Sequence, residues 1–122
     1  MDRDLEGIRV LVVEDRAPVA MALCDRLMDH GAAIVGPAAK LPQATELAEG
    51  GAFDIAILDV DLDGVYTFPL ARALAARAVP VVLMTGYDAR TIPEDLRGLP
   101  LFDKLGSIGD PTRILLGLVH AE

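Results

Sequence analysis

Several residue types are scarce in this 122-residue chain, and each scarcity excludes a class of protein. A single cysteine, Cys24, cannot form an internal disulfide or a cysteine-based metal site, and it fits a reducing compartment. Lys and Arg total 11 against 19 Asp and Glu, a net charge of −8 that argues against a nucleic-acid-binding surface. No apolar run approaches the roughly 20 residues that span a bilayer. The polar start, MDRDLEG, does not resemble a signal peptide. We therefore expect a cytoplasmic protein that binds neither nucleic acid nor membrane.

What the chain does contain is typical of one folded domain. Hydrophobic residues make up 52% of the sequence and charged residues 25%, an ordinary globular composition. The length suits a single core. The sequence has no internal repeat, low-complexity tract or interdomain linker. We expect residues 1–122 to form one stand-alone domain with no second, output domain.

The most informative stretch is 53–64, FDIAILDVDLDG. Its apolar run is broken only by Asp54 and ends in Asp59, Asp61 and Asp63, followed by a glycine. A short apolar run bounded by turn residues is typical of a strand buried on both faces of a parallel sheet. The carboxylates then follow its carboxyl end, where open α/β sheets place their ligands. Asp59 is therefore the first candidate functional residue.

Hydrophobic periodicity and turn residues predict the other elements. Besides the strand at 53–58, strands are expected at 8–13, 33–35, 79–84 and 101–102. Helices are expected at 18–27, 41–49, 69–77 and 93–96, and from Pro111 to the end of the chain. Asp110-Pro111 is a strong helix start, an N-cap followed by proline at the first helical position. Gly36-Pro37 is predicted to end the second strand, and Asp63-Gly64 is interpreted as a turn.

Five strands alternating with helices predict an α/β fold, a doubly wound (βα)₅ sandwich of three layers with the flavodoxin-like parallel strand order 2-1-3-4-5. In that order the first and third strands lie side by side. Glu14, Asp15 and Asp59 would then converge on one pocket. Thr85 ends the fourth strand and Lys104 follows the fifth, so both are expected beside the acids.

This constellation has a specific chemistry. Carboxylates at close range repel one another, so they either share protons or hold a hard cation. All-oxygen ligation suits Mg²⁺, and a carboxylate beside Mg²⁺ can attack phosphorus to give an acyl phosphate. The Lys104 ammonium and the Thr85 hydroxyl would contact oxygens of the transferred group. Each residue alone has a plainer interpretation, as a helix cap, a turn or a solvated charge, but the combination favours a phosphoacceptor site.

Across essentially its whole length the sequence resembles a response-regulator receiver domain, the phosphoacceptor of two-component signalling. The resemblance rests on residues 12–15 (VVED), 57–62 (ILDVDL), 85–87 (TGY) and 100–104 (PLFDK). It implies that Asp59 is phosphorylated and that Thr85 and Lys104 contact the phosphoryl group. It also implies that Mg²⁺ is held by Glu14, Asp15, Asp59 and the backbone carbonyl of Asp61, with Asp15 the more direct ligand of the acidic pair.

The short loop after Asp59 and the segment 83–87, LMTGY, are similar to a single-domain receiver subgroup. That subgroup bears a Phe-Ala-Thr-Gly-hydrophobic-Tyr motif and is associated with bacterial HWE/HisKA2-type kinases. The resemblance implies a phosphorelay protein that is not an enzyme. Its implied partners are a histidine kinase of that type, or a histidine phosphotransferase, and a downstream protein. The sequence leaves a homodimer open.

Three residues depart from the usual receiver pattern. Leu105 replaces the proline that usually follows the lysine in a cis bond, and we expect a trans bond here because a non-proline cis bond costs roughly 3–4 kcal/mol. Leu101 replaces the usual switch aromatic, for which Tyr87 is a candidate substitute. Asp61 adds a carboxylate where the subgroup often has asparagine.

Two other functions compete. Asp59-Val60-Asp61 resembles the nucleophile motif of haloacid-dehalogenase-type phosphatases, with Asp61 as general acid. In that family, however, the motif ends the first strand and another acidic pair comes late in the chain. The departures at Leu101 and Leu105 would instead suit a pseudo-receiver, a binding module that does not use phosphate. Retention of Asp59, Thr85 and Lys104 together argues against it.

Overall fold

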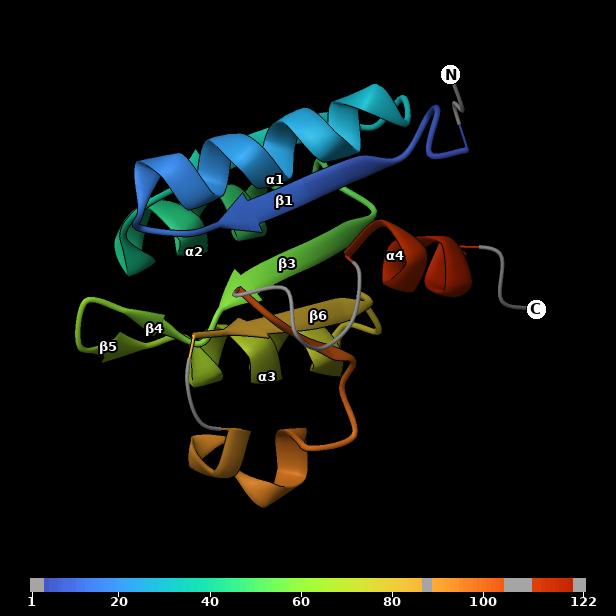
Figure 1. Cartoon of the computed structure of the whole chain (residues 1–122). Coiled ribbons are helices and arrows are strands. Elements are labelled where there is room, and N and C mark those ends of the chain that lie inside the picture. The colour runs from blue at the N-terminus through green and yellow to red at the C-terminus, as the bar shows by residue number, and fades with distance from the viewer. Residues whose placement is uncertain (1–3, 87–88, 105–110, 120–122) are drawn as a thin grey trace.

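The computed structural model describes residues 4–86, 89–104 and 111–119, which form a parallel sheet between two layers of helices (Figure 1). The sheet strands are β1 (Arg9–Val13), β2 (Ala33–Ala38), β3 (Ile55–Asp59), β6 (Val81–Thr85) and β7 (Leu101–Asp103). They pair in the order β2-β1-β3-β6-β7, and every pairing is parallel. The predicted order 2-1-3-4-5 is confirmed, with β6 and β7 as its fourth and fifth strands.

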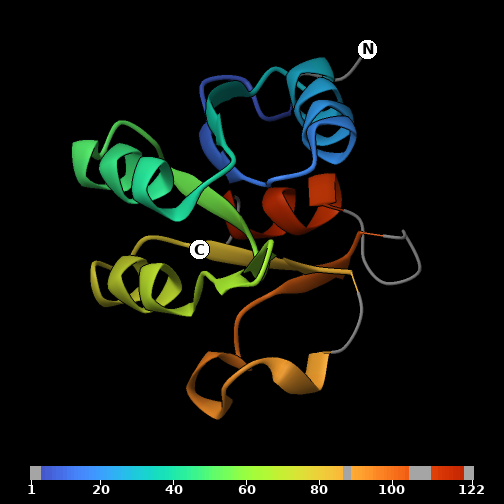
Figure 2. The ribbon, with the colours of Figure 1, turned by 90° about the vertical axis from the view of Figure 1, so that its left-hand side faces the viewer.

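The helical layers lie on opposite faces of this sheet. The α-helices are α1 (Ala17–Asp29), α2 (Leu41–Gly50), α3 (Phe68–Ala76) and α4 (Pro111–Val119). Helices α1 and α4 pack on one face, and α2 and α3 pack on the other (Figure 2). Between β6 and β7 the chain forms two 3₁₀ turns, η1 (Ala89–Thr91) and η2 (Glu94–Leu96), in keeping with the short helix predicted there. The predicted N-cap Asp110 lies outside the described residues.

Side-chain alternation along the strands divides the core in two. Val10 and Val12 pack with the α1 and α4 side chains, whereas Leu11 and Val13 pack with those of α2 and α3. Every residue of β3 is buried, which explains its continuous apolar run. The buried residues of α1 recur at helical spacing: Ala20, Leu23, Cys24 and Leu27. In α3 the buried residues are Phe68, Leu70, Ala71 and Leu74, whereas Ala75 is exposed.

The predicted end of the second strand is also wrong, because β2 continues through Gly36-Pro37 to Ala38. Its register against β1 shifts between the pairs Leu11–Val35 and Val13–Ala38, so the glycine and proline form a bulge on an edge strand, where proline is tolerated. Gly36 has φ +100°, and an added Cβ would meet Val12 O at 2.9 Å. Only glycine therefore fits this bulge without strain.

Asp63-Gly64 is a turn, as interpreted, but sequence reasoning missed the two-stranded hairpin around it. Strand β4 (Asp61–Leu62) pairs antiparallel with β5 (Val65–Tyr66). Asp63 has φ 52° and Gly64 φ 91°, the paired positive angles that tight hairpin turns require and that Asp-Gly supplies readily. The hairpin projects beyond the carboxyl end of β3 (Figure 1).

Candidate functional site

Asp59 is the last residue of β3, and backbone contacts on both sides hold it there. The Val60 amide donates to Met84 O at 2.9 Å, which joins the end of β3 to β6. The Thr67 hydroxyl donates to Asp59 O at 2.7 Å from the start of α3. The Asp61 amide donates to the carboxylate itself, at 3.2 Å from Oδ1. Asp59 is thus a fixed carboxylate, only 2% exposed, at the edge of the sheet where ligands bind.

The predicted convergence of the acidic residues is present in the structure. Glu14 and Asp15 follow β1, which pairs directly with β3. Each of Glu14, Asp15 and Asp59 offers a carboxylate oxygen within 4.8 Å of the others. Glu14 is 2% exposed and Asp15 is partly buried. Carboxylates that lie this close together and are largely shielded from water need a nearby cation to compensate their negative charge.

Lys104 supplies one cation to this cluster. Its backbone amide donates to Thr85 O at 2.9 Å, which carries the residue beyond β7 and turns its side chain over the end of β3. The ammonium Nζ lies 2.7 Å from Asp59 Oδ2 and 3.0 Å from Glu14 Oε2. The Lys104 side chain is 12% exposed. A single buried ammonium therefore bridges two of the three acids.

Burial and these contacts shift the pKa values of Glu14, Asp59 and Lys104. Burial raises the pKa of Glu14 to about 7, although the Arg16 amide and the Lys104 ammonium both favour the carboxylate. Burial likewise raises the pKa of Asp59 against the opposing hydrogen bonds from Lys104 and Asp61. Burial opposes the charge on Lys104, but its hydrogen bonds to Asp59 and Glu14 outweigh that effect and raise its pKa. The single positive charge of Lys104 therefore does not fully compensate the negative charges of the buried carboxylates.

The donor set fits a hard divalent cation. The cluster offers only carboxylate oxygens, which Mg²⁺ prefers. The Arg16 amide and the Lys104 ammonium both donate to Glu14 Oε1, at 3.0 and 3.1 Å. The buried Glu14 Oε2 accepts no well-aligned hydrogen bond although the ammonium is near it. An unsatisfied buried carboxylate oxygen beside two other carboxylates is a suitable metal-ligand position.

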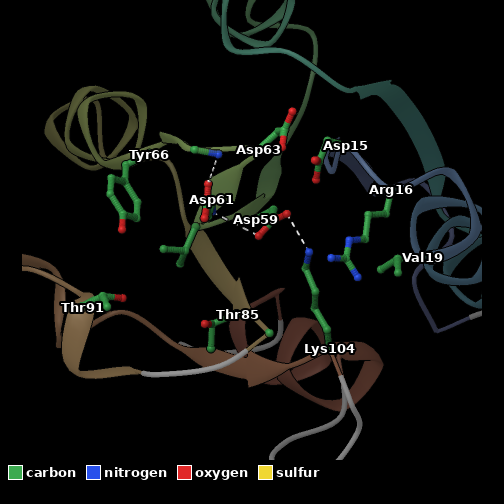
Figure 3. A pocket seen from close by; sticks show the side chains of 13 residues that line it. Asp15, Arg16, Val19, Asp59, Asp61, Asp63, Tyr66, Thr85, Thr91 and Lys104 are labelled. Atoms are coloured by element: carbon green, nitrogen blue, oxygen red, sulfur yellow. Dashed lines mark hydrogen bonds and ion pairs between the residues drawn. The ribbon is translucent and has the colours of Figure 1, made fainter.

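A cavity of about 620 Å³ opens in front of Asp59 (Figure 3). Thr85, at the end of β6, lines the same cavity as Asp59 and Lys104, as predicted. Asp61 and Asp63 of the hairpin also line it. The Asp61 carboxylate accepts a hydrogen bond from the Gly64 amide at 2.6 Å, so the hairpin turn restrains it. All the candidate residues named from the sequence lie in the acidic cluster or around this cavity: Glu14, Asp15, Asp59, Asp61, Thr85 and Lys104.

Sequence reasoning missed three residues around the site. Thr67 is fully buried and holds the Asp59 carbonyl, and the only sequence signal for it was its place before Phe68-Pro69, which open a helix. Tyr66 lines the cavity and stacks on Phe68, with ring centroids 5.1 Å apart. Arg16 lines the cavity from the start of α1 and carried no motif signal.

The departures from the receiver pattern are only partly visible. Leu101 lies in β7, is partly buried and pairs with Leu83 in the sheet. The predictions for the Leu105 peptide bond and for Tyr87 fall outside the described residues.

Comparison with known proteins identifies the class to which this fold and site belong. Residues 10–108 match the family model for the response regulator receiver domain, so the chain belongs to that family. It is 34% identical over 90 residues to the transcriptional regulatory protein PdtaR of Mycobacterium tuberculosis. That alignment covers 73% of this chain but 44% of PdtaR, so the chain spans less than half the length of that relative.

Two solved structures are also similar. SdrG from Pseudomonas melonis Fr1, in its BeF₃-activated conformation, has a TM-score of 0.75 at 34% identity, covering 91% of this chain and 95% of SdrG. BeF₃-activated Sma0114 has a TM-score of 0.58 at 32% identity, covering 100% of this chain and 97% of Sma0114. Among the described residues, no helix is both long and apolar enough to cross a membrane.

Proposed function

We propose that this receiver domain accepts one phosphoryl group on Asp59 from a phosphohistidine and passes the signal on through protein contacts. The observation that carries the proposal is the Asp59 carboxylate at the end of a central strand, with Lys104 Nζ 2.7 Å away. Glu14 and Asp15 each place a carboxylate oxygen within 4.8 Å of it. Phosphoryl transfer requires a nucleophile, a cation that contacts the phosphoryl oxygens, and ligands for a metal ion. Asp59, Lys104 and the acidic pair would supply these three parts.

Each residue has a distinct role in the transfer. An Asp59 oxygen forms the new bond to phosphorus, the bond from phosphorus to the donor nitrogen breaks, and the imidazole leaves with its electron pair and takes up a proton. Lys104 exchanges its contact with Glu14 for one with a phosphoryl oxygen, and the Thr85 hydroxyl donates to another. Glu14, Asp15, Asp59 and the Asp61 carbonyl would hold Mg²⁺, which neutralises charge on the transferred group when bound.

The donor is proposed to be a histidine kinase or a histidine phosphotransferase, with HWE/HisKA2-type kinases favoured by the resemblance at residues 83–87. Three similar proteins support this setting through their names alone. The chain is 31% identical over 93 residues to the sensor protein TorS of Escherichia coli, of which it covers 10%. SdrG and Sma0114 are described in BeF₃-activated states. The downstream protein partner and self-association as a homodimer stay predictions.

Intact-protein mass spectrometry after incubation with acetyl phosphate and Mg²⁺ tests the proposal. We expect one labile phosphoryl adduct per chain and no sustained release of phosphate from a small phosphate monoester. Continuous turnover of the monoester would favour the haloacid-dehalogenase-type alternative, in which Asp61 acts as general acid. Absence of any adduct, at every Mg²⁺ concentration, would favour the pseudo-receiver.

A further inference from the structure

Besides Lys104, the candidate site holds a second basic side chain, that of Arg16. It lines the same cavity as Asp59, Thr85 and Lys104. Figure 3 shows its guanidinium reaching inward from the start of α1, on the side of the Lys104 ammonium. Among the described residues that line this cavity, Arg16 and Lys104 are the only cations, in a chain of net charge −8.

The local environment of Arg16 does not explain why an arginine stands there. It occupies the N-cap of α1, where Ser, Thr, Asp and Asn are preferred because their side chains accept from the first amides of a helix. The arginine side chain makes no such bond, and an arginine has no acceptor to offer. Its backbone amide donates to Glu14 Oε1, a contact that any residue except proline could make. Helix capping therefore does not account for an arginine at this position.

No other residue of the described chain holds the guanidinium group of Arg16. In the described part of the chain it forms no ion pair or hydrogen bond, although Asp15, Asp61 and Asp63 line the same cavity. Arg9 and Arg72, by contrast, are each paired with an aspartate. Arginine presents donors in a planar fork that matches the oxygens of a phosphoryl group. The side chain is therefore exposed, charged, and directed at the space in which such a group on Asp59 would lie.

We propose that Arg16 binds a non-bridging oxygen of the phosphoryl group at Asp59, sharing with Lys104 the charge that phosphorylation brings. The inference rests on the proposed function, because it presumes that Asp59 is the acceptor. An acyl phosphate carries a charge comparable to the −1.5 to −2 of a phosphate ester at about neutral pH, in place of the single negative charge of the Asp59 carboxylate. That charge is added in a cavity that Asp15, Asp61 and Asp63 already make negative. Two cations, one at the start of α1 and one after β7, are available to share it.

The test is a titration with beryllofluoride, a phosphoryl mimic for aspartate, in saturating Mg²⁺ and followed by NMR. Arg16→Gln removes the fork and the charge but keeps the backbone amide that serves Glu14. Arg26→Gln is the matched control, because Arg26 is exposed in the last turn of the same helix and its loss changes the net charge equally. We expect beryllofluoride to bind Arg16→Gln about tenfold more weakly than wild type, with Arg26→Gln within about twofold. The affinity of Arg16→Lys for beryllofluoride should lie between those of wild type and Arg16→Gln.

A second measurement separates a contact with the phosphoryl group from an effect on the metal site. Mg²⁺ titration without beryllofluoride should give Arg16→Gln an affinity equal to or higher than that of wild type, because a nearby positive charge has been removed. Equal beryllofluoride affinity in Arg16→Gln and Arg26→Gln would overturn the proposal, as would a parallel loss of Mg²⁺ affinity. If wild type binds no beryllofluoride, the proposed function fails first.

Discussion

Lys104 is the residue on which the electrostatics of the metal-free site depend. It lies between Glu14 and Asp59, each 2% exposed, and its ammonium is the only positive charge in contact with them among the described residues. Removing one partner of a buried ion pair is costly because the remaining charge stays buried and uncompensated. In this site two carboxylates would remain. We therefore expect the lysine to be structural without Mg²⁺ and to become available for a phosphoryl group once a metal compensates the carboxylates.

We predict that Lys104→Ala lowers the free energy of unfolding by roughly 2 kcal/mol in EDTA, since Glu14 and Asp59 lose their shared counter-ion. Saturating Mg²⁺ should recover most of this loss, so the variant gains more from Mg²⁺ than wild type does. Urea unfolding with and without Mg²⁺ measures both effects. The chain's other lysine offers a control, because Lys40 is exposed and Lys40→Ala should change little. A variant as stable as wild type in EDTA would contradict the assigned role.

A pH dependence follows from Glu14. Its pKa in the folded protein is raised to about 7, above the ordinary value of 4.5 that it regains on unfolding. Between these values the folded state holds more protons than the unfolded state, so the stability contributed by Glu14 falls as the pH rises. The raised pKa of Asp59 acts in the same direction. The Lys104 shift acts only near its own ordinary value of 10.5, outside this window.

We therefore predict that the metal-free protein becomes less stable from pH 5 to pH 7.5, and that Glu14→Gln makes this part of the profile flatter. Urea midpoints in EDTA across the range measure it. A wild-type profile that rises through this interval would show that Glu14 is not held in a proton-binding environment.

At the scale of elements, the connection from β3 to α3 holds Asp59, the proposed phosphoryl acceptor, in place. The hairpin of β4 and β5 leaves Asp59 and returns at Thr67, whose hydroxyl donates to the Asp59 carbonyl at 2.7 Å. The Thr67 amide donates to Val60 O at 3.0 Å. Thr67 is the N-cap of α3 but makes no side-chain cap, because its hydroxyl is bonded to the strand instead. The chain thus uses a buried hydroxyl to hold the end of β3 against the start of α3.

Thr67→Val tests that role, because valine has nearly the same shape and lacks only the hydroxyl. We predict a loss of about 1–2 kcal/mol in the free energy of unfolding, the usual cost of leaving a buried acceptor unpaired. The rate of labelling by acetyl phosphate should also fall, since the carboxylate is less well held. Thr45→Val, in α2 and away from the site, is the control. Unchanged stability and rate in Thr67→Val would contradict the argument.

The elements that could be predicted are those with strong hydrophobic periodicity or uninterrupted apolar runs. The five sheet strands, their order and the buried face of α1 follow from such patterns. The hairpin around Asp63-Gly64 could not be predicted, because each strand is two residues long and has no periodicity of its own. The extension of β2 through Gly36-Pro37 was missed for another reason. These residues usually end a strand, and only tertiary pairing with β1 keeps them in the sheet.

At the scale of the whole molecule, the topology is what assembles the site. Glu14, Asp59, Thr85 and Lys104 are far apart in the sequence, yet each stands at or just beyond the carboxyl end of a strand, and parallel strands bring those ends to one edge. This is why the acidic cluster could be predicted from strand order alone. The bridging of Glu14 and Asp59 by Lys104 could not, because a side-chain contact depends on distances that sequence spacing does not determine. Thr67 and Arg16 were missed because neither belongs to a motif.

The central claim is that Asp59 alone receives the phosphoryl group, and one comparison tests it most directly. Wild type, Asp59→Asn and Asp54→Asn are incubated with acetyl phosphate and Mg²⁺, and the adduct is measured by intact mass and located by peptide mapping. Asp54 is the matched control because it lies just before β3, paired with Arg9 and outside the cavity. We predict one acid-stable, base-labile adduct on Asp59 in wild type and in Asp54→Asn, and none in Asp59→Asn. An adduct with the same lability and yield in Asp59→Asn would contradict the account.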